Sequence, residues 1–182
     1  MANLEQVERL KQSVTGWNAW RQENPDVQPD LVGTNLNGAD MRYANLSHTD
    51  LSSARLRGAK LSYANLNYVK LSSAKLHEAD LNHALFWGTT LLNIDLRTTK
   101  GLAGISHRGP FPIHLPSVHL PEGGSALHFL RGVGLPDEYI ETWRTTMLSP
   151  IQYHSVFISC PSTDEFLARR LHADLQAQGV WY

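Results

Sequence analysis

The sequence predicts a mainly β fold in which the chain coils into a solenoid, and three features of residues 31–96 predict it. A large apolar side chain stands at every fifth position from Leu31 to Leu96, fourteen times in succession. A mostly small residue stands two places before each of these centres from Thr34 to Ile94, and the other positions are mostly polar. Neither the helical period of about 3.6 nor the strand period of about 2 keeps such a set on one side of a straight element. The chain must therefore turn at a fixed interval, as solenoids do.

The stretches ADMRYANLSHTDL and AKLSYANL carry the repeated motif A-(D/N)-L-x-x. This motif resembles that of the pentapeptide-repeat family over roughly residues 30–97. The resemblance implies a right-handed, four-sided (quadrilateral) β-helix with twenty residues per coil. Large centres would fill its axis, and the small residues would allow tight corners. A leucine-rich helix with chance spacing is the alternative.

Stacked coils would place residues i and i+20 about 4.8 Å apart. The column of Tyr43, Tyr63 and His83, which we call the Tyr43 column, is the candidate interaction surface, because aromatic side chains are enriched at interface anchors. Lateral packing between stacked rings is the alternative. Three further stacks are predicted: Asp40, Lys60 and Asp80 with alternating charge, Asn45 with Asn65, and Arg55 with Lys75, whose like charges argue against perfect register.

The segments on either side of the repeat favour helices. Residues 1–28 are expected to hold one amphipathic helix over 3–23 that caps the open end of the solenoid (29–97) with Trp17 and Trp20. A helix lying on a membrane is disfavoured because its polar face has few basic residues. Residues 98–150 predict a Pro- and Gly-rich connector with two short helices, one ending at Gly132 and one with Pro136 in its first turn.

No metal site is expected in the connector. Its histidines show no established zinc-ligand spacing, and Cys160 is the only thiol of the chain. A DNA-reading helix pair is disfavoured, because Arg131 and Arg144 alone supply positive charge there. The histidines considered are His107, His114, His119 and His128.

Residues 151–182 predict a strand, a helix and the start of a second strand, which is how a parallel α/β sheet begins. The stretch VFISCPSTDEFLARRLHADLQAQGVWY resembles the start of a TIR domain, a flavodoxin-like fold. The resemblance implies that Ser159, Cys160 and Pro161 would lie beside NAD in a complete TIR domain. The family's catalytic glutamate lies further along than Tyr182, so we expect no catalytic residue, no bound cofactor and no enzyme activity from this chain.

Charge and composition limit the partners. The net charge is −1, and residues 30–96 carry six acidic against six basic side chains, which disfavours nucleic-acid binding and a DNA-mimicking gyrase inhibitor. One cysteine excludes an internal disulfide framework, and no signal peptide or membrane span is seen, so a cytoplasmic protein is expected.

The expected function is that of a non-catalytic scaffold or sensor in a bacterial TIR signalling or defence effector. The full-length form of such an effector would cleave NAD⁺ or recruit other TIR domains. Protein partners are expected, including self-association through the solenoid or the TIR domain. The alternative is a stand-alone pentapeptide-repeat interaction module.

Overall fold

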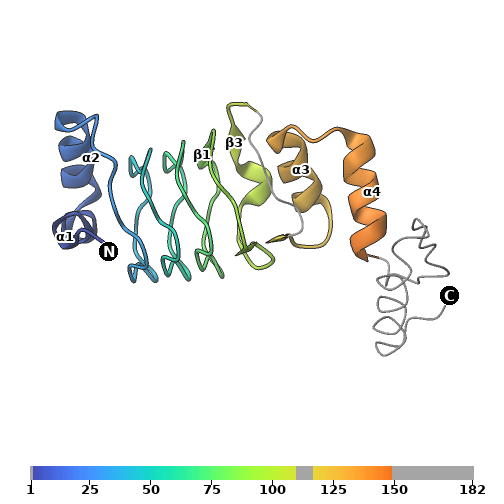
Figure 1. Ribbon diagram of the computed structural model, residues 1–182, viewed down its shortest axis with the longest axis horizontal. Helices are drawn as coiled ribbons and strands as arrows, with labels where there is room; N and C mark the ends of the chain where they lie inside the picture. Colours follow the sequence, from blue (N-terminus) through green and yellow to red (C-terminus); the bar gives the residue numbers. More distant parts are fainter. Residues whose placement is uncertain (1, 110–116, 149–182) are drawn as a thin grey trace, which may run out of the picture. The chain divides into compact units, whose positions relative to one another are not determined.

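The computed structural model describes residues 2–109 and 117–148. The chain divides into two compact units, Met1–Ile140 and Glu141–Tyr182. The coils and the helices α1 to α3 belong to the first unit. In that unit α1 and α2 lie at one end of the stacked coils and α3 lies at the other (Figure 1).

Two helices, α1 (Leu4–Gln12) and α2 (Val14–Glu23), replace the single helix expected over residues 3–23. Ser13 separates them. Its backbone is extended, its N–H donates to the Arg9 carbonyl (3.3 Å), and its hydroxyl accepts from the Gly16 N–H (3.2 Å). Serine is a preferred helix N-cap because its side chain satisfies a free N–H of the first turn. The expectation of one continuous helix was therefore wrong.

The five-residue repeat forms tight turns. From Leu31 to Leu81, the N–H of the third residue after each centre donates to the carbonyl of that centre at 2.9–3.3 Å. The second residue after each centre has a positive φ in thirteen successive turns, from Gly33 (68°) to Asn93 (51°). All fourteen apolar centres are at most 1% exposed. The fourteen apolar centres predicted to face inward therefore form the core of the solenoid.

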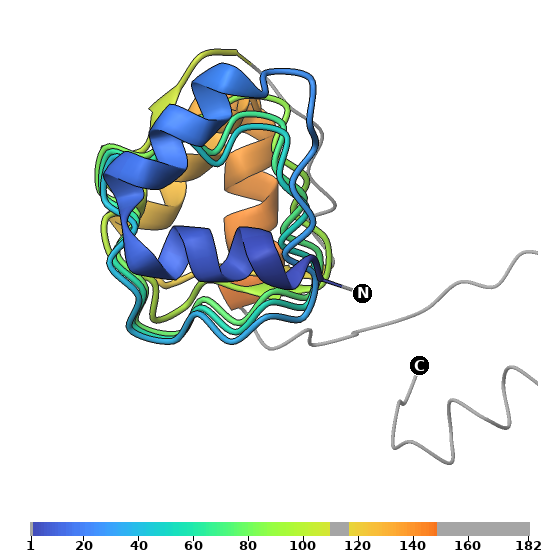
Figure 2. The same ribbon diagram turned by 90° about the vertical axis from the view of Figure 1, so that its left-hand side faces the viewer.

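Successive coils stack in parallel with an offset of twenty residues, from Asp30 against Asp50 to Asp80 against Lys100. An end-on view shows the coils lying over one another, with α1 and α2 across the near end (Figure 2). Each turn supplies a single residue that bridges to the neighbouring coil, so the described residues form few regular strands. Arg55 and Lys75 also pair in register, and the expected disturbance from their like charges was wrong because both side chains are exposed to water.

The stacking continues past Leu96, where the sequence rhythm stops. β1 (Leu85–Phe86) pairs with β3 (Ser106–His107), and β2 (Ile94–Asp95) pairs with β4 (Val118–His119), both in parallel. The offsets are 21 and 24 residues instead of twenty. A 3-10 turn, η1 (Leu102–Gly104), lies between β2 and β3. Residues 100–107 and 118–119 thus lie on the last regular coil in a less regular arrangement.

Helix α3 (Gly124–Val133) buries Phe129, Leu130 and Val133. Gly134, and not Gly132 as predicted, follows its end in the left-handed conformation (φ 95°) and donates to the carbonyls of Leu130 and Arg131. Helix α4 (Asp137–Leu148) begins directly after the predicted Pro136. In the part of the chain that the structure describes, no helix is long and apolar enough to cross a bilayer.

Candidate functional site

The Tyr43 column forms as predicted. The rings of Tyr43 and Tyr63 stack with centroids 5.0 Å apart and planes 9° apart, and His83 stacks on Tyr63 at 4.8 Å and 22°. Tyr43 is 63% exposed and Tyr63 47%. The three rings therefore present their edges to water while covering part of each other's faces.

The turns of the repeat fix where these rings lie. All three column residues occupy the left-handed position of their turns, with φ between 57° and 63°. This conformation costs a residue with a Cβ about 1–2 kcal/mol. Ring stacking of about 0.5–1.5 kcal/mol per pair offsets part of that cost. The column is thus held by backbone geometry as well as by ring contacts.

A second column lies on the following turn of each coil. His48 stacks on Tyr68 (4.8 Å, 15°), and Tyr68 meets Trp87 at a tilt (5.0 Å, 49°). We call these three residues the Tyr68 column. Our sequence reasoning missed it, although the twenty-residue offset from His48 to Tyr68 was a readable signal. Position 88, the next in register, is glycine, and a Cβ there would come within 2.6 Å of the Tyr68 ring.

Charged side chains line a groove beside the Tyr43 column. Lys60 lies between Asp40 and Asp80 in the predicted alternating column, and its Nζ is 4.0 Å from a carboxylate oxygen of Asp40. Arg42 binds Asp40 with two side-chain hydrogen bonds of 2.6 and 2.8 Å. These hydrogen bonds lower the pKa of Asp40 to about 2. The predicted stack of Asn65 on Asn45 also forms, with a hydrogen bond of 3.2 Å.

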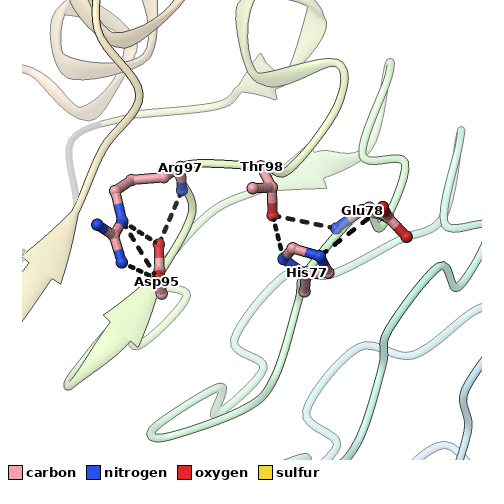
Figure 3. Close-up of polar contacts among 5 residues, drawn as sticks. All are labelled: His77, Glu78, Asp95, Arg97 and Thr98. Carbon is pink, nitrogen blue, oxygen red and sulfur yellow. Dashed lines mark hydrogen bonds and ion pairs between the residues drawn. The ribbon is translucent and has the colours of Figure 1, made fainter.

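The parallel ladder opens at one place. Among the described residues, no main-chain hydrogen bond joins residues 74–77 to residues 94–97, and a groove lies there. Side chains bridge the opening instead, because the Thr98 hydroxyl lies 2.7 Å from Nδ1 of His77 and accepts from the Glu78 N–H at 3.3 Å (Figure 3). Asp95 is held by Arg97 at 2.7 Å, which lowers the pKa of that carboxyl to about 2 (Figure 3).

The described histidines of the connector have different surroundings. His107 packs between Phe86 and Phe129, with ring centroids at 6.3 and 5.6 Å, and its burial together with His128 lowers its pKa to about 4. His119 lies at the groove of the open ladder. Across residues 2–109 and 117–148, no group of three or more His, Cys, Asp or Glu side chains is placed to hold a metal ion.

The candidate NAD contacts Ser159, Cys160 and Pro161, together with His114, lie outside the described residues. Of the two predicted sites, the Tyr43 column is therefore the one that lies within the described residues.

Comparison with known proteins finds a family model that matches the repeat. Residues 28–58 and 49–88 match the family model "Pentapeptide repeats", in eight copies. No curated protein matches the chain.

Solved pentapeptide repeat proteins also align with the chain. One from the thylakoid lumen of Arabidopsis thaliana is 19% identical, with 61% of this chain and 91% of that chain covered and a TM-score of 0.36. One from Nostoc PCC 7120 is 30% identical (59% and 79% covered, TM-score 0.30). HetL from the same cyanobacterium, which is involved in heterocyst differentiation regulation, is 24% identical (52% and 48% covered, TM-score 0.32).

Proposed function

Because the chain carries a pentapeptide-repeat solenoid, we propose that it is an interaction scaffold that binds a protein partner through the Tyr43 and Tyr68 columns. The observation that supports this proposal is the placement of six rings on two consecutive turns of the coils. On the other two turns of each coil, the equivalent left-handed positions carry small or polar residues, such as Ser53 and Glu78. The aromatic surface is therefore confined to one part of the solenoid.

The rings suit binding for an energetic reason. Aromatic side chains dominate interface energies, and immobilising a flexible side chain costs about 0.5–1.5 kcal/mol on binding. Tyr63 and Tyr68 each contact a ring on both sides, so much of that cost has already been met in folding. Both side chains are still 40–47% exposed, which leaves area for a partner to cover.

A peptide-display selection against the purified chain tests the proposal. Enriched peptides are expected to lose at least tenfold in affinity for the double variant Tyr63→Ser, Tyr68→Ser. Glu78→Ser is the matched control, because Glu78 has the same left-handed backbone (φ 59°) in a column without rings. The role of the columns would be refuted if every enriched peptide bound the double variant as tightly as the wild type.

In its finer form, the proposal makes the solenoid the regulatory or scaffolding part of a TIR-domain effector that cleaves NAD⁺ or recruits other TIR domains. Its support is the sequence resemblance of residues 151–182 to the start of that domain. Ser159, Cys160 and Pro161 would then lie near NAD once the domain is complete.

Nicotinamide release tests this finer form. We expect release from a gene product that continues past residue 182 and offers a glutamate on a later helix, and none from the 182-residue chain. Release by the 182-residue chain would contradict it, and no release by the longer product would refute NAD⁺ cleavage and leave recruitment of other TIR domains as its role.

A further inference from the structure

Helices α1 and α2 occupy only part of the end of the first coil. We propose that the remaining part is a docking edge, where a segment of a partner protein adds in parallel as a further side of the solenoid. This inference rests on main-chain groups of the first coil and not on the rings of either column. Its test variants lie at Asn35 instead of Tyr63 and Tyr68, so the two proposals can fail separately.

The occupied part shows what this edge requires. Asp30 donates its N–H to the Gln6 side chain (2.9 Å) and accepts from the Asn3 N–H (2.9 Å). Asn45 donates its N–H to the Asn18 side chain (2.7 Å) and accepts from the Trp17 indole (2.8 Å). Three side chains and one main-chain N–H of the N-terminal segment therefore stand where the main chain of a preceding coil would stand.

Arg21 completes the occupied part. It is 4% exposed, and its guanidinium donates to the carbonyls of Val27 (2.6 Å) and Ser47 (3.0 Å). On two of the four sides of the first coil, the bridging residues Asp30 and Asn45 thus have their outward main-chain N–H and C=O groups paired.

The other two sides are open. Within the described part of the chain, the main-chain N–H and C=O groups of Asn35 and Asp40 and the carbonyls of Asn37 and Arg42 make no hydrogen bond to protein. A groove runs here, lined by Leu10 and Lys11 of α1 and by residues 35–41 of the coil. An open edge of unpaired main-chain donors and acceptors is a template for another strand.

The inner wall of the coil is also less covered on these sides. Ala39 is half-buried, whereas Ala59, one coil further on, is fully buried. Apolar surface is therefore left at the edge for an incoming side chain to cover.

The molecule itself shows how the edge would be filled. Residues 54–63 pack on the next coil through six main-chain hydrogen bonds of 2.8–3.0 Å. Leu56, Gly58, Leu61 and Tyr63 donate to carbonyls of that coil, and the carbonyls of residues 54 and 59 accept from it. These bonds join residues 54–63 to residues 75, 77, 80 and 82, and two coils before those four lie the free groups of residues 35, 37, 40 and 42.

Charge identifies the kind of segment that fits. Lys60 lies against Asp80 in the ladder, and the residue equivalent to Asp80 on the free edge is Asp40. A segment with the pattern of residues 54–63 places its lysine beside Asp40. The expected partner segment thus has two large apolar residues five apart, a glycine two places after the first, and a basic residue just before the second.

The ten-residue peptide ARLRGAKLSY, the sequence of residues 54–63, is the probe. Labelled at its N-terminus, it should bind the 182-residue chain saturably in fluorescence anisotropy. N-methylation of its two leucines removes two of the donors and is expected to weaken binding at least tenfold.

Protein variants test the edge directly. Asn35→Pro removes an N–H that makes no bond in the fold, so its urea midpoint should equal that of Asn35→Ala while peptide affinity falls at least tenfold. Asn35→Ala loses the same side-chain contact to the Asn37 N–H but keeps the main-chain donor, and should bind like the wild type. Arg55→Pro is the stability control, because the Arg55 N–H donates to the Thr34 carbonyl (2.8 Å).

Several results would overturn the proposal. These are the absence of saturable binding to the wild type, tenfold weaker binding by Asn35→Ala, and unchanged binding by Asn35→Pro or of the N-methylated peptide. A dimer in sedimentation velocity that Asn35→Pro dissolves would also overturn it, because a second copy would then occupy the edge.

Discussion

Trp17 and Trp20 lie on the same helix but should respond very differently to the same substitution. Trp17 is 0% exposed, and its indole N–H donates to the Asn45 carbonyl at 2.8 Å. Trp20 is half-buried, and its ring packs on Trp17 with centroids 5.2 Å apart. Phenylalanine at either position keeps an aromatic ring but removes the indole N–H, so the pair of variants isolates the hydrogen bond to the first coil.

For Trp17→Phe, the Asn45 carbonyl loses its partner at a part-buried site under the fully buried Trp17 ring. An unsatisfied buried acceptor costs about 1–3 kcal/mol, and the smaller ring leaves a gap that adds about 1 kcal/mol. We therefore expect the free energy of unfolding to fall by about 2–4 kcal/mol. For Trp20→Phe, we expect a fall of less than about 1 kcal/mol, since the partly exposed ring remains.

Urea unfolding followed by circular dichroism measures both changes as shifts of the midpoint at constant slope. Equal shifts for the two variants would refute the reasoning, because the single buried hydrogen bond is the main difference between the sites. A Trp17→Phe shift within about 0.5 kcal/mol of zero would refute it as well.

Three further predictions follow from single contacts. Leu61→Ala empties a fully buried centre and should cost about 3–4 kcal/mol in the same urea experiment, whereas a loss below about 1 kcal/mol would contradict the packed axis. His107 has its pKa lowered to about 4, so the unfolded chain binds more protons between pH 6.5 and 4. Stability should fall as the pH drops through that window, and His107→Gln should flatten the slope. Arg42→Ala should raise the NMR-measured pKa of Asp40 from about 2 toward 3.8, and no change would show that Arg42 is not the cause.

The repeat could be predicted because it depends on local rules applied at every turn. The large centres follow from counting in fives. The twenty-residue stacking, and with it the Tyr43 column, follows from the resemblance to the pentapeptide-repeat family. The break at Ser13 could not be separated from a continuous apolar pattern, since Val14 and Trp17 keep the helical spacing across it.

The C-terminal end was harder to predict because its contacts do not repeat. Offsets of 21 and 24 residues leave no period to count. Gly132 looks like a helix end in the sequence, yet it lies inside α3. A glycine stands there because the His107 ring fills the space that a Cβ would occupy. Only the tertiary contact distinguishes it from Gly134.

The left-handed residue in every turn makes the solenoid modular in steps of five. Deleting five residues between Leu46 and Leu81 restores a large centre and a left-handed position at each following turn, and twists the C-terminal coil by a quarter revolution against α1 and α2. Deleting twenty removes one coil and leaves the two ends facing as before. Gene-level duplications and losses in units of fifteen bases would therefore reorient the ends, and those of sixty bases would only change their separation.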